Sequence, residues 1–169
     1  KHVIEQTPEL YMAAIQQNGM ALKYVVCKQT HEMCMTAVQQ NGAALQYVTC
    51  KQTPEMCMMA IQQSPRTLRF VKNQTPELCM VAVRQNGYTL ECVKNQTPEL
   101  CMAAVTQNGD AFKHVKHQTL ELCMAAVTRS GSMLEMVNMA QTPEMCMAAV
   151  QQYGYALQYV KNQTPELCM

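Results

Sequence analysis

Residues 96–117 read QTPELCMAAVTQNGDAFKHVKH, and close copies of this segment fill the 169-residue chain. The Gln-Thr pair at its start recurs every 22 or 23 residues, with the threonine at Thr7, Thr30, Thr53, Thr75, Thr97, Thr119, Thr142 and Thr164. Each longer step adds its extra residue between a valine and the next Gln, which marks that place as a loop. Such a fixed period is typical of a protein built from tandem structural repeats.

Each repeat carries the signals of two helices. Thr before Pro is typical of an N-cap followed by the first helical residue, and the Glu that comes next favours the positive end of the helix dipole. The pattern predicts first helices near Pro8–Gln17 and at each later period. Gly19 and its equivalents follow Asn, where glycine commonly ends a helix in the left-handed conformation. Second, shorter helices are predicted near Met20–Val25 and onward, because the alternation expected of strands is missing.

The apolar residues indicate how the helices pack. Leu78, Cys79, Ala82 and Val83 fall on one stripe of a first helix. The alanine at the position of Ala82 never varies among the copies, which indicates close approach of a neighbouring helix, since a larger side chain would overpack the contact. A two-helix unit this small cannot bury its apolar side alone and must stack on its neighbours. We therefore predict an all-α fold, an α-solenoid of stacked two-helix repeats.

The repeats run from one end of the sequence to the other. We expect residues 1–169 to form a single repeat array, with seven complete repeats (7–163) and partial units at both ends. The chain begins at Lys1, and its last copy stops inside a first helix. Neither end carries the polar terminal unit that a solenoid needs for solubility. We therefore expect these residues to be an excerpt of a longer chain; coverage of the ends by identical chains is the alternative.

Composition and charge argue against several classes of protein. The chain is 49% hydrophobic and has 13 Lys and Arg against 12 Asp and Glu, which is ordinary for a protein with a continuous core. Because no apolar run approaches the roughly 18 residues of a membrane span, no membrane partner is expected. Lysines recur in the loop that ends the repeats, but the balanced net charge makes a nucleic-acid partner unlikely.

Ten cysteines could indicate disulfides, but seven of them share one position of the repeat. Stacked helices lie about 8–10 Å apart, whereas a disulfide needs Cα atoms within about 7 Å, so equivalent cysteines cannot crosslink along the array. We predict that Cys79, Cys101 and Cys123 are buried and reduced, and that the loop cysteines Cys27 and Cys50 are freer. A reducing intracellular environment is favoured.

Catalytic, metal and cofactor sites are not expected. Cys is followed by Met in most copies, but adjacent residues of a helix point about 100° apart, so the two sulfurs do not converge on copper. His114, His117 and Glu121 are separated by the start of a new helix, which argues against zinc. There is no phosphate-binding glycine loop and no recurring Ser/His/Asp set. We predict a protein that is not an enzyme and has no small-molecule substrate.

A glutamine precedes every capping threonine, although an exposed residue should vary as its neighbours do. Its amide can donate and accept hydrogen bonds, so it could bond the last carbonyls of the preceding helix or the Gln of the next repeat. Duplication without constraint is the alternative. We predict that these side chains form a structural ladder and call them the loop glutamines: Gln29, Gln52, Gln74, Gln96, Gln118 and Gln141.

Two positions of the second helix vary among the copies and lie on one side of that helix. A constant scaffold with one variable side is how repeat proteins build binding surfaces, although drift at solvated positions gives the same pattern. We call the candidate interaction face the variable surface. Its residues are Met20, Tyr24, Ala43, Tyr47, Arg66, Phe70, Tyr88, Asp110, His114, Ser132, Tyr155 and Tyr159.

The motif Thr-Pro-Glu-Leu-Cys-x-Ala-Ala-Val-x-Gln-Asn-Gly-x-Ala-Leu-x-x-Val resembles a repeat family catalogued as a domain of unknown function, seen in giant viruses, amoeba-associated bacteria and some protists. Ser64-Pro65 replaces Asn-Gly in one copy, and His31 and Leu120 replace the first proline in two others. The resemblance implies no activity, catalytic residue or cofactor.

We therefore expect a non-catalytic protein-interaction or scaffold module, whose partner is another protein. A self-assembling structural protein, whose partners are identical chains in a fibre or layer, is the first alternative. A nucleic-acid-binding repeat is the second.

Overall fold

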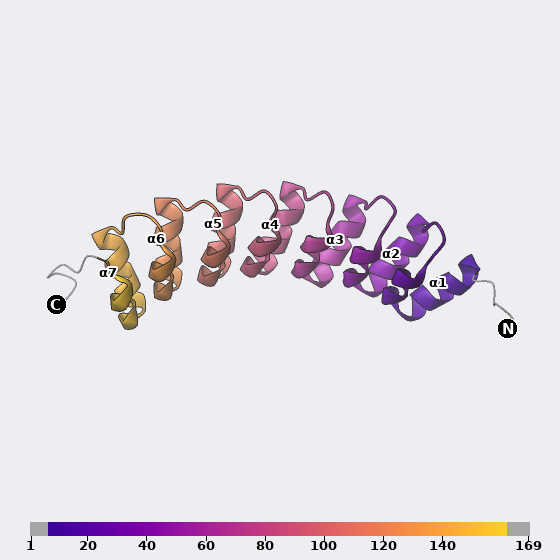
Figure 1. Ribbon diagram of the computed structural model, residues 1–169, viewed down its shortest axis with the longest axis horizontal. Coiled ribbons are helices and arrows are strands. Elements are labelled where there is room, and N and C mark those ends of the chain that lie inside the picture. Colours follow the sequence, from indigo (N-terminus) through magenta and orange to yellow (C-terminus); the bar gives the residue numbers. More distant parts are fainter. Residues whose placement is uncertain (1–6, 162–169) are drawn as a thin grey trace. The chain divides into compact units, whose positions relative to one another are not determined.

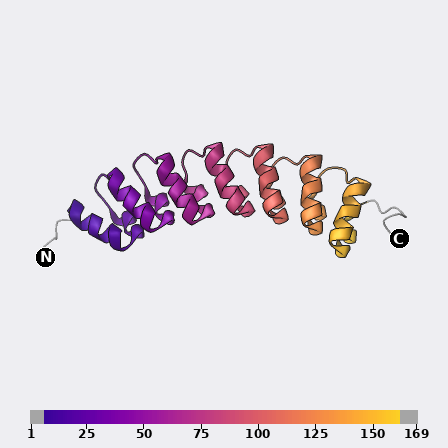
Figure 2. The same cartoon turned by 180° about the vertical axis from the view of Figure 1, so that it is seen from behind.

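The structure is a computed structural model that describes residues 7–161. They divide between Leu78 and Cys79 into two compact units, each of which is described by itself. All regular elements of the described residues are helices, which confirms the predicted all-α repeat fold. The longer α-helices, labelled in Figure 1, alternate with six-residue 3₁₀-helices, which we denote η; Figure 2 shows the same ribbon from behind.

The first unit holds α1 (Pro8–Gln17), η1 (Gly19–Tyr24), α2 (His31–Gln40), η2 (Gly42–Tyr47), α3 (Pro54–Gln63) and η3 (Pro65–Phe70). Helix α4 (Pro76–Gln85) spans the division between the units. The second unit continues with η4 (Gly87–Cys92), α5 (Pro98–Gln107), η5 (Gly109–His114), α6 (Leu120–Arg129), η6 (Gly131–Met136), α7 (Pro143–Gln152) and η7 (Gly154–Tyr159). We count repeats from each loop glutamine, so that residues 29–51 are the second repeat and residues 96–117 the fifth.

The predicted starts of the α-helices are confirmed. Thr7 is the N-cap of α1, and its hydroxyl accepts a hydrogen bond from the backbone N–H of Leu10 at 3.3 Å. Helices α2 and α6 begin at the predicted place although His31 and Leu120 replace proline, because the preceding threonine still caps each helix. The threonine thus suffices to start the helix.

The predicted left-handed glycine at the end of each α-helix is wrong. No described residue, glycine included, has a positive φ. Asn18 instead ends α1 in an extended conformation (φ −152°, ψ 110°) and also caps η1, its side chain accepting the backbone N–H of Met20 at 3.0 Å. Extended backbone is open to any residue, which explains why Ser64 and Tyr153 can take the place of asparagine.

The second helices are 3₁₀-helices that begin at the glycine, one residue before the predicted start. Helix η1 closes its first turn with the N–H of Ala21 on the carbonyl of Asn18 at 2.8 Å. Val25 lies just after the helix and donates to the carbonyl of Leu22 at 3.2 Å. Short 3₁₀ turns of this kind commonly join longer elements.

Within each unit the repeats pack only on their neighbours. In the first unit α2 contacts α1, α3, η1 and η2, and in the second unit α6 contacts α5, α7, η5 and η6. The apolar stripe of α5 is fully used, because Leu100, Cys101, Ala104 and Val105 are all buried. Leu22 and its equivalents in the η-helices fill the space between the α-helices; Phe112 takes this place in η5. Stability of this arrangement comes from repeats and their shared interfaces.

The constant alanine and the glycine that begins most η-helices lie against each other across several pairs of adjacent repeats. A Cβ atom built on Gly42 would be 2.9 Å from the carbonyl oxygen and 3.1 Å from the Cα of Ala60 in the next repeat. At Gly87 the same atom would be 2.5 Å from the carbonyl oxygen of Ala104. Glycine is needed here for close backbone approach rather than for an unusual φ. The sequence predicted a neighbouring helix close to the constant alanine. That neighbour is the first residue of the η-helix in the preceding repeat.

Candidate interaction surfaces

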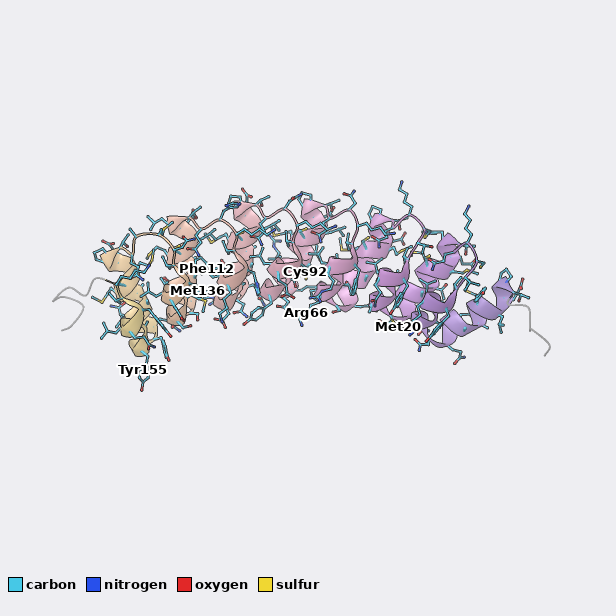
Figure 3. All side chains as sticks on the ribbon, in the orientation of Figure 1. Met20, Arg66, Cys92, Phe112, Met136 and Tyr155 are labelled. Atoms are coloured by element: carbon cyan, nitrogen blue, oxygen red, sulfur yellow. The ribbon has the colours of Figure 1, made fainter. Side chains whose placement is uncertain are left out.

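The η-helices carry the whole of the variable surface. Tyr24, Arg66 and Tyr155 are exposed, and the other nine residues are half-buried. Tyr155 is 75% exposed, which is high for a large apolar side chain. In Figure 3, Met20 and Arg66 lie at the same edge of the first unit, and Tyr155 lies at the end of the last repeat of the second unit. The positions that vary among the copies are therefore accessible to solvent.

In the first unit the variable surface forms a small basic hollow. A groove of about 300 Å³ lies between η2 and η3 and is lined by Ala43, Arg66 and Phe70, which were predicted, and by Arg69, which was not. Two guanidinium groups and an aromatic ring suit a carboxylate or another planar anion beside an apolar group.

In the second unit the residues of adjacent repeats touch one another. The Tyr88 hydroxyl donates a hydrogen bond to Oδ2 of Asp110 at 3.1 Å, and the rings of Tyr88 and His114 meet edge to face with centroids 6.0 Å apart. Asp110 also accepts from the Ser130 hydroxyl at 3.1 Å. Partial burial and the bond to the Asp110 carboxylate raise the pKa of Tyr88, so its hydroxyl stays a donor. Tyr88, Asp110 and Ser130 thus form a continuous row of side chains across the fourth, fifth and sixth repeats.

A second surface, on the α-helices of the second unit, was missed by the sequence reasoning. A groove of about 720 Å³ runs over α4, α5 and α6 and is lined by Met80, Met102, Ala103, Leu122 and Glu99, among others. We call it the methionine groove. Its signal in the sequence was the methionine that follows the shared cysteine in most copies. These methionines are half-buried, and Met80 and Met102 line the groove.

In the hydrogen bonds that the structure describes, the loop glutamines bond mainly to backbone groups and not to one another. Gln96 donates to the carbonyl of His114 at 2.8 Å and to that of Leu90 in the preceding repeat at 3.3 Å, and it accepts from the N–H of Lys116 at 3.0 Å. Gln52, Gln118 and Gln141 make the same pair of bonds to the end of their own repeats. One amide thus joins the loop that enters a repeat to the loop that leaves it.

A second glutamine, at the end of the α-helix, was not singled out from the sequence. Gln63 donates to the carbonyl of Val38 at 2.8 Å and accepts from the N–H of Gly42 at 2.6 Å, both in the preceding repeat. Gln107 and Gln152 accept in the same way from Gly87 and Gly131. The recurrence of Gln before Asn-Gly was the available signal for this bridge between repeats.

The shared cysteines lie in the core, as predicted. Cys79, Cys101 and Cys123 are buried, and burial raises the pKa of each thiol. Cys101 points its sulfur at Oε1 of Gln96, 3.6 Å away. No disulfide is present among the described cysteines. A thiol rather than a thiolate is therefore the stable form at this position.

The lysines at the ends of the repeats also bond to backbone. The ammonium groups of Lys72, Lys116 and Lys161 lie 3.0, 3.0 and 3.4 Å from backbone carbonyls of the preceding repeat. Such contacts hold these cations near the loops. Within residues 7–161 no three His, Cys, Asp or Glu side chains gather into a metal-binding group. No helix of the described part of the chain is long and apolar enough to cross a membrane.

Comparison with known proteins identifies similarity in the first three repeats. Residues 7–52 and, one repeat further on, residues 30–75 match a family described as "Domain of unknown function (DUF4116)". The two overlapping matches follow the repeat itself, as expected for a tandem array. No curated protein and no solved structure matches the chain.

Proposed function

We propose that the chain is a non-catalytic interaction module that presents the variable surface of its η-helices to another protein. The observation that carries the proposal is the contact of Tyr88 with both Asp110 and His114 of the next repeat. Variable side chains that touch across repeats make a surface longer than one repeat, which is what a protein partner needs. Tyr, Arg and His side chains are also common in binding interfaces.

The rest of the scaffold supports a binding role. The loop glutamines and the Gly–Ala contacts fix the backbone independently of the variable residues, so these can change without loss of the fold. The lysines that would favour nucleic acid donate to backbone carbonyls instead, and Asp110 lies in the middle of the row. A protein partner is therefore favoured over a nucleic acid.

Selection from a library of random peptides displayed on phage tests the proposal. Peptides enriched on the immobilised chain should lose at least about tenfold in affinity to a Tyr88→Ala/Asp110→Ala/His114→Ala variant, as expected when central contacts are removed. The matched control changes the other surface, with Met102→Ala and Thr106→Ala in the methionine groove. Peptides that respond only to the control variant would move the site to that groove.

Light scattering distinguishes the structural alternative. An interaction module should keep the mass of a single chain as concentration rises, whereas a fibre or layer subunit should grow. Growth that the triple variant abolishes would show that the partner is a second copy of this chain.

A further inference from the structure

Two cysteines of the second repeat place their sulfur atoms in contact. Cys34 lies on α2 and is fully buried, while Cys50 lies in the loop after η2 and is half-exposed. Their Sγ atoms are 3.2 Å apart. A disulfide bond is about 2.0 Å long, so a small movement of the loop cysteine is sufficient to form one.

Other repeats carry only one member of this pair. In the first repeat, Cys27 occupies the loop position of Cys50. The helix position of Cys34 is occupied by Tyr11 in that repeat. In the sixth repeat Cys123 is present and the loop residue is Met139. These three repeats share one extra residue in this loop.

We propose that Cys34 and Cys50 are a reversible dithiol–disulfide site that reacts with small-molecule disulfides of the glutathione class. The proposal concerns a modification of the scaffold and is independent of the interaction role proposed above.

The reaction balances as two thiol–disulfide exchanges. The Cys50 thiolate, formed by loss of its proton to solvent, attacks one sulfur of glutathione disulfide, which releases one glutathione thiolate and leaves glutathione bound to Cys50. The Cys34 sulfur then attacks Cys50, gives up its proton and releases the second glutathione. The protein loses two hydrogens and two electrons, and one glutathione disulfide becomes two glutathione thiols.

The surroundings assign the order of the two steps. Solvent reaches Cys50 but not Cys34, so the external disulfide meets Cys50 first. Burial, and then the contact with Cys50, raise the pKa of Cys34 to about 12, and its thiol donates to Oε1 of Gln29 at 3.3 Å. Cys34 therefore stays protonated until a disulfide on Cys50 is beside it.

The bond would reinforce an existing contact. Oε1 of Gln29 already accepts the N–H of Thr49 at 2.8 Å, which ties the loop to the start of the same repeat. The same loop leads directly to Gln52, which holds the end of the third repeat. Oxidation would thus fasten the loop that leaves the second repeat to its own helix, α2.

Mass spectrometry of tryptic peptides tests the proposal on the full chain. Trypsin cuts after Lys28 and Lys51, so both cysteines leave on one peptide, residues 29–51, while Cys27 leaves on residues 24–28. The native protein is incubated with glutathione disulfide, and its remaining thiols are blocked by alkylation before digestion. Residues 29–51 should be lighter by two hydrogens and carry neither alkyl groups nor glutathione. Cys27, the matched control, should carry glutathione.

Two variants make the outcome decisive. In Cys34→Ala, glutathione should remain on Cys50, and Met139→Cys should create a new crosslink to Cys123. Two results would overturn the proposal. One is glutathione that remains on Cys50 in the protein of native sequence. The other is alkylation of both Cys34 and Cys50 in a sample in which Cys27 carries glutathione.

Discussion

Gly87 and Tyr88 are adjacent in the chain, yet their positions behave in opposite ways across the repeats. The glycine position is Gly in every copy but one, where Pro65 stands, whereas the next position carries Met, Ala, Arg, Tyr, Asp or Ser. Gly87 faces the backbone carbonyl of Ala104 and donates to the amide of Gln107, while Tyr88 contacts the side chains of Asp110 and His114. At these two positions, the nearly constant residue packs against the backbone of the next repeat, whereas the variable residue contacts only its side chains.

The largest expected effect is at the glycine. Gly87→Ala places a methyl group 2.5 Å from the Ala104 carbonyl oxygen and 2.9 Å from Oε1 of Gln107, so the two repeats must move apart. We expect a loss of about 3 kcal/mol in the free energy of unfolding, at the upper end of overpacking effects. Urea denaturation followed by circular dichroism measures the loss, and hydrogen exchange should rise in the fourth and fifth repeats before the seventh.

Gly154→Ala is the control for this substitution. No atom of the described residues lies within 4 Å of a Cβ built there. The change should leave stability within about 0.5 kcal/mol or raise it slightly, because alanine favours helix over glycine. Equal losses at Gly87 and Gly154 would mean that glycine serves the η-helix itself and not the contact between repeats.

An intermediate effect is expected at the loop glutamine Gln96. Gln96→Ala removes the partner of the carbonyls of Leu90 and His114 and of the Lys116 N–H. Water can reach part of this edge and replace some of the bonds, so we expect a loss of about 2 kcal/mol, equivalent to two or three net hydrogen bonds. The amide of Lys116 should lose its protection from hydrogen exchange.

Gln158→Ala provides the matched control, because Gln158 is exposed on η7. Its loss should change the free energy of unfolding by less than about 0.5 kcal/mol, as at most surface positions. If Gln96→Ala were equally mild, the repeated glutamine would reflect duplication without constraint.

The sequence predicts the elements of this fold well because each repeat shows the same local signals. Thr30 and Thr119 start their helices even without the following proline, and the apolar stripe of α5 is buried as expected. The role of glycine was assigned wrongly because a glycine after a helix suits either a left-handed turn or a close contact. Only the position of Ala104 in the next repeat distinguishes the two.

The candidate sites could be predicted only in part. The variation among copies selected solvent-accessible positions, but it could not show that Tyr88 reaches Asp110 and His114, since distances between repeats depend on how the helices stack. The methionine groove and the contact of Cys34 with Cys50 were missed for the same reason. Met80, Met102 and Leu122 come from different repeats, and 15 residues separate the two cysteines.

The smallest expected effect is at Ser132, on the variable side of the comparison. Its hydroxyl lies 3.1 Å from that of Ser130, which keeps Asp110 as a second partner when Ser132 is replaced. Ser132 is half-buried on η6, so part of a larger side chain there would lie in solvent. Ser132→Leu should therefore change the free energy of unfolding by less than about 0.5 kcal/mol, measured by the same urea denaturation. A loss approaching that of Gly87→Ala would show that Ser132 belongs to the packed interior of the repeat, and the variable positions would then no longer define a surface for a partner.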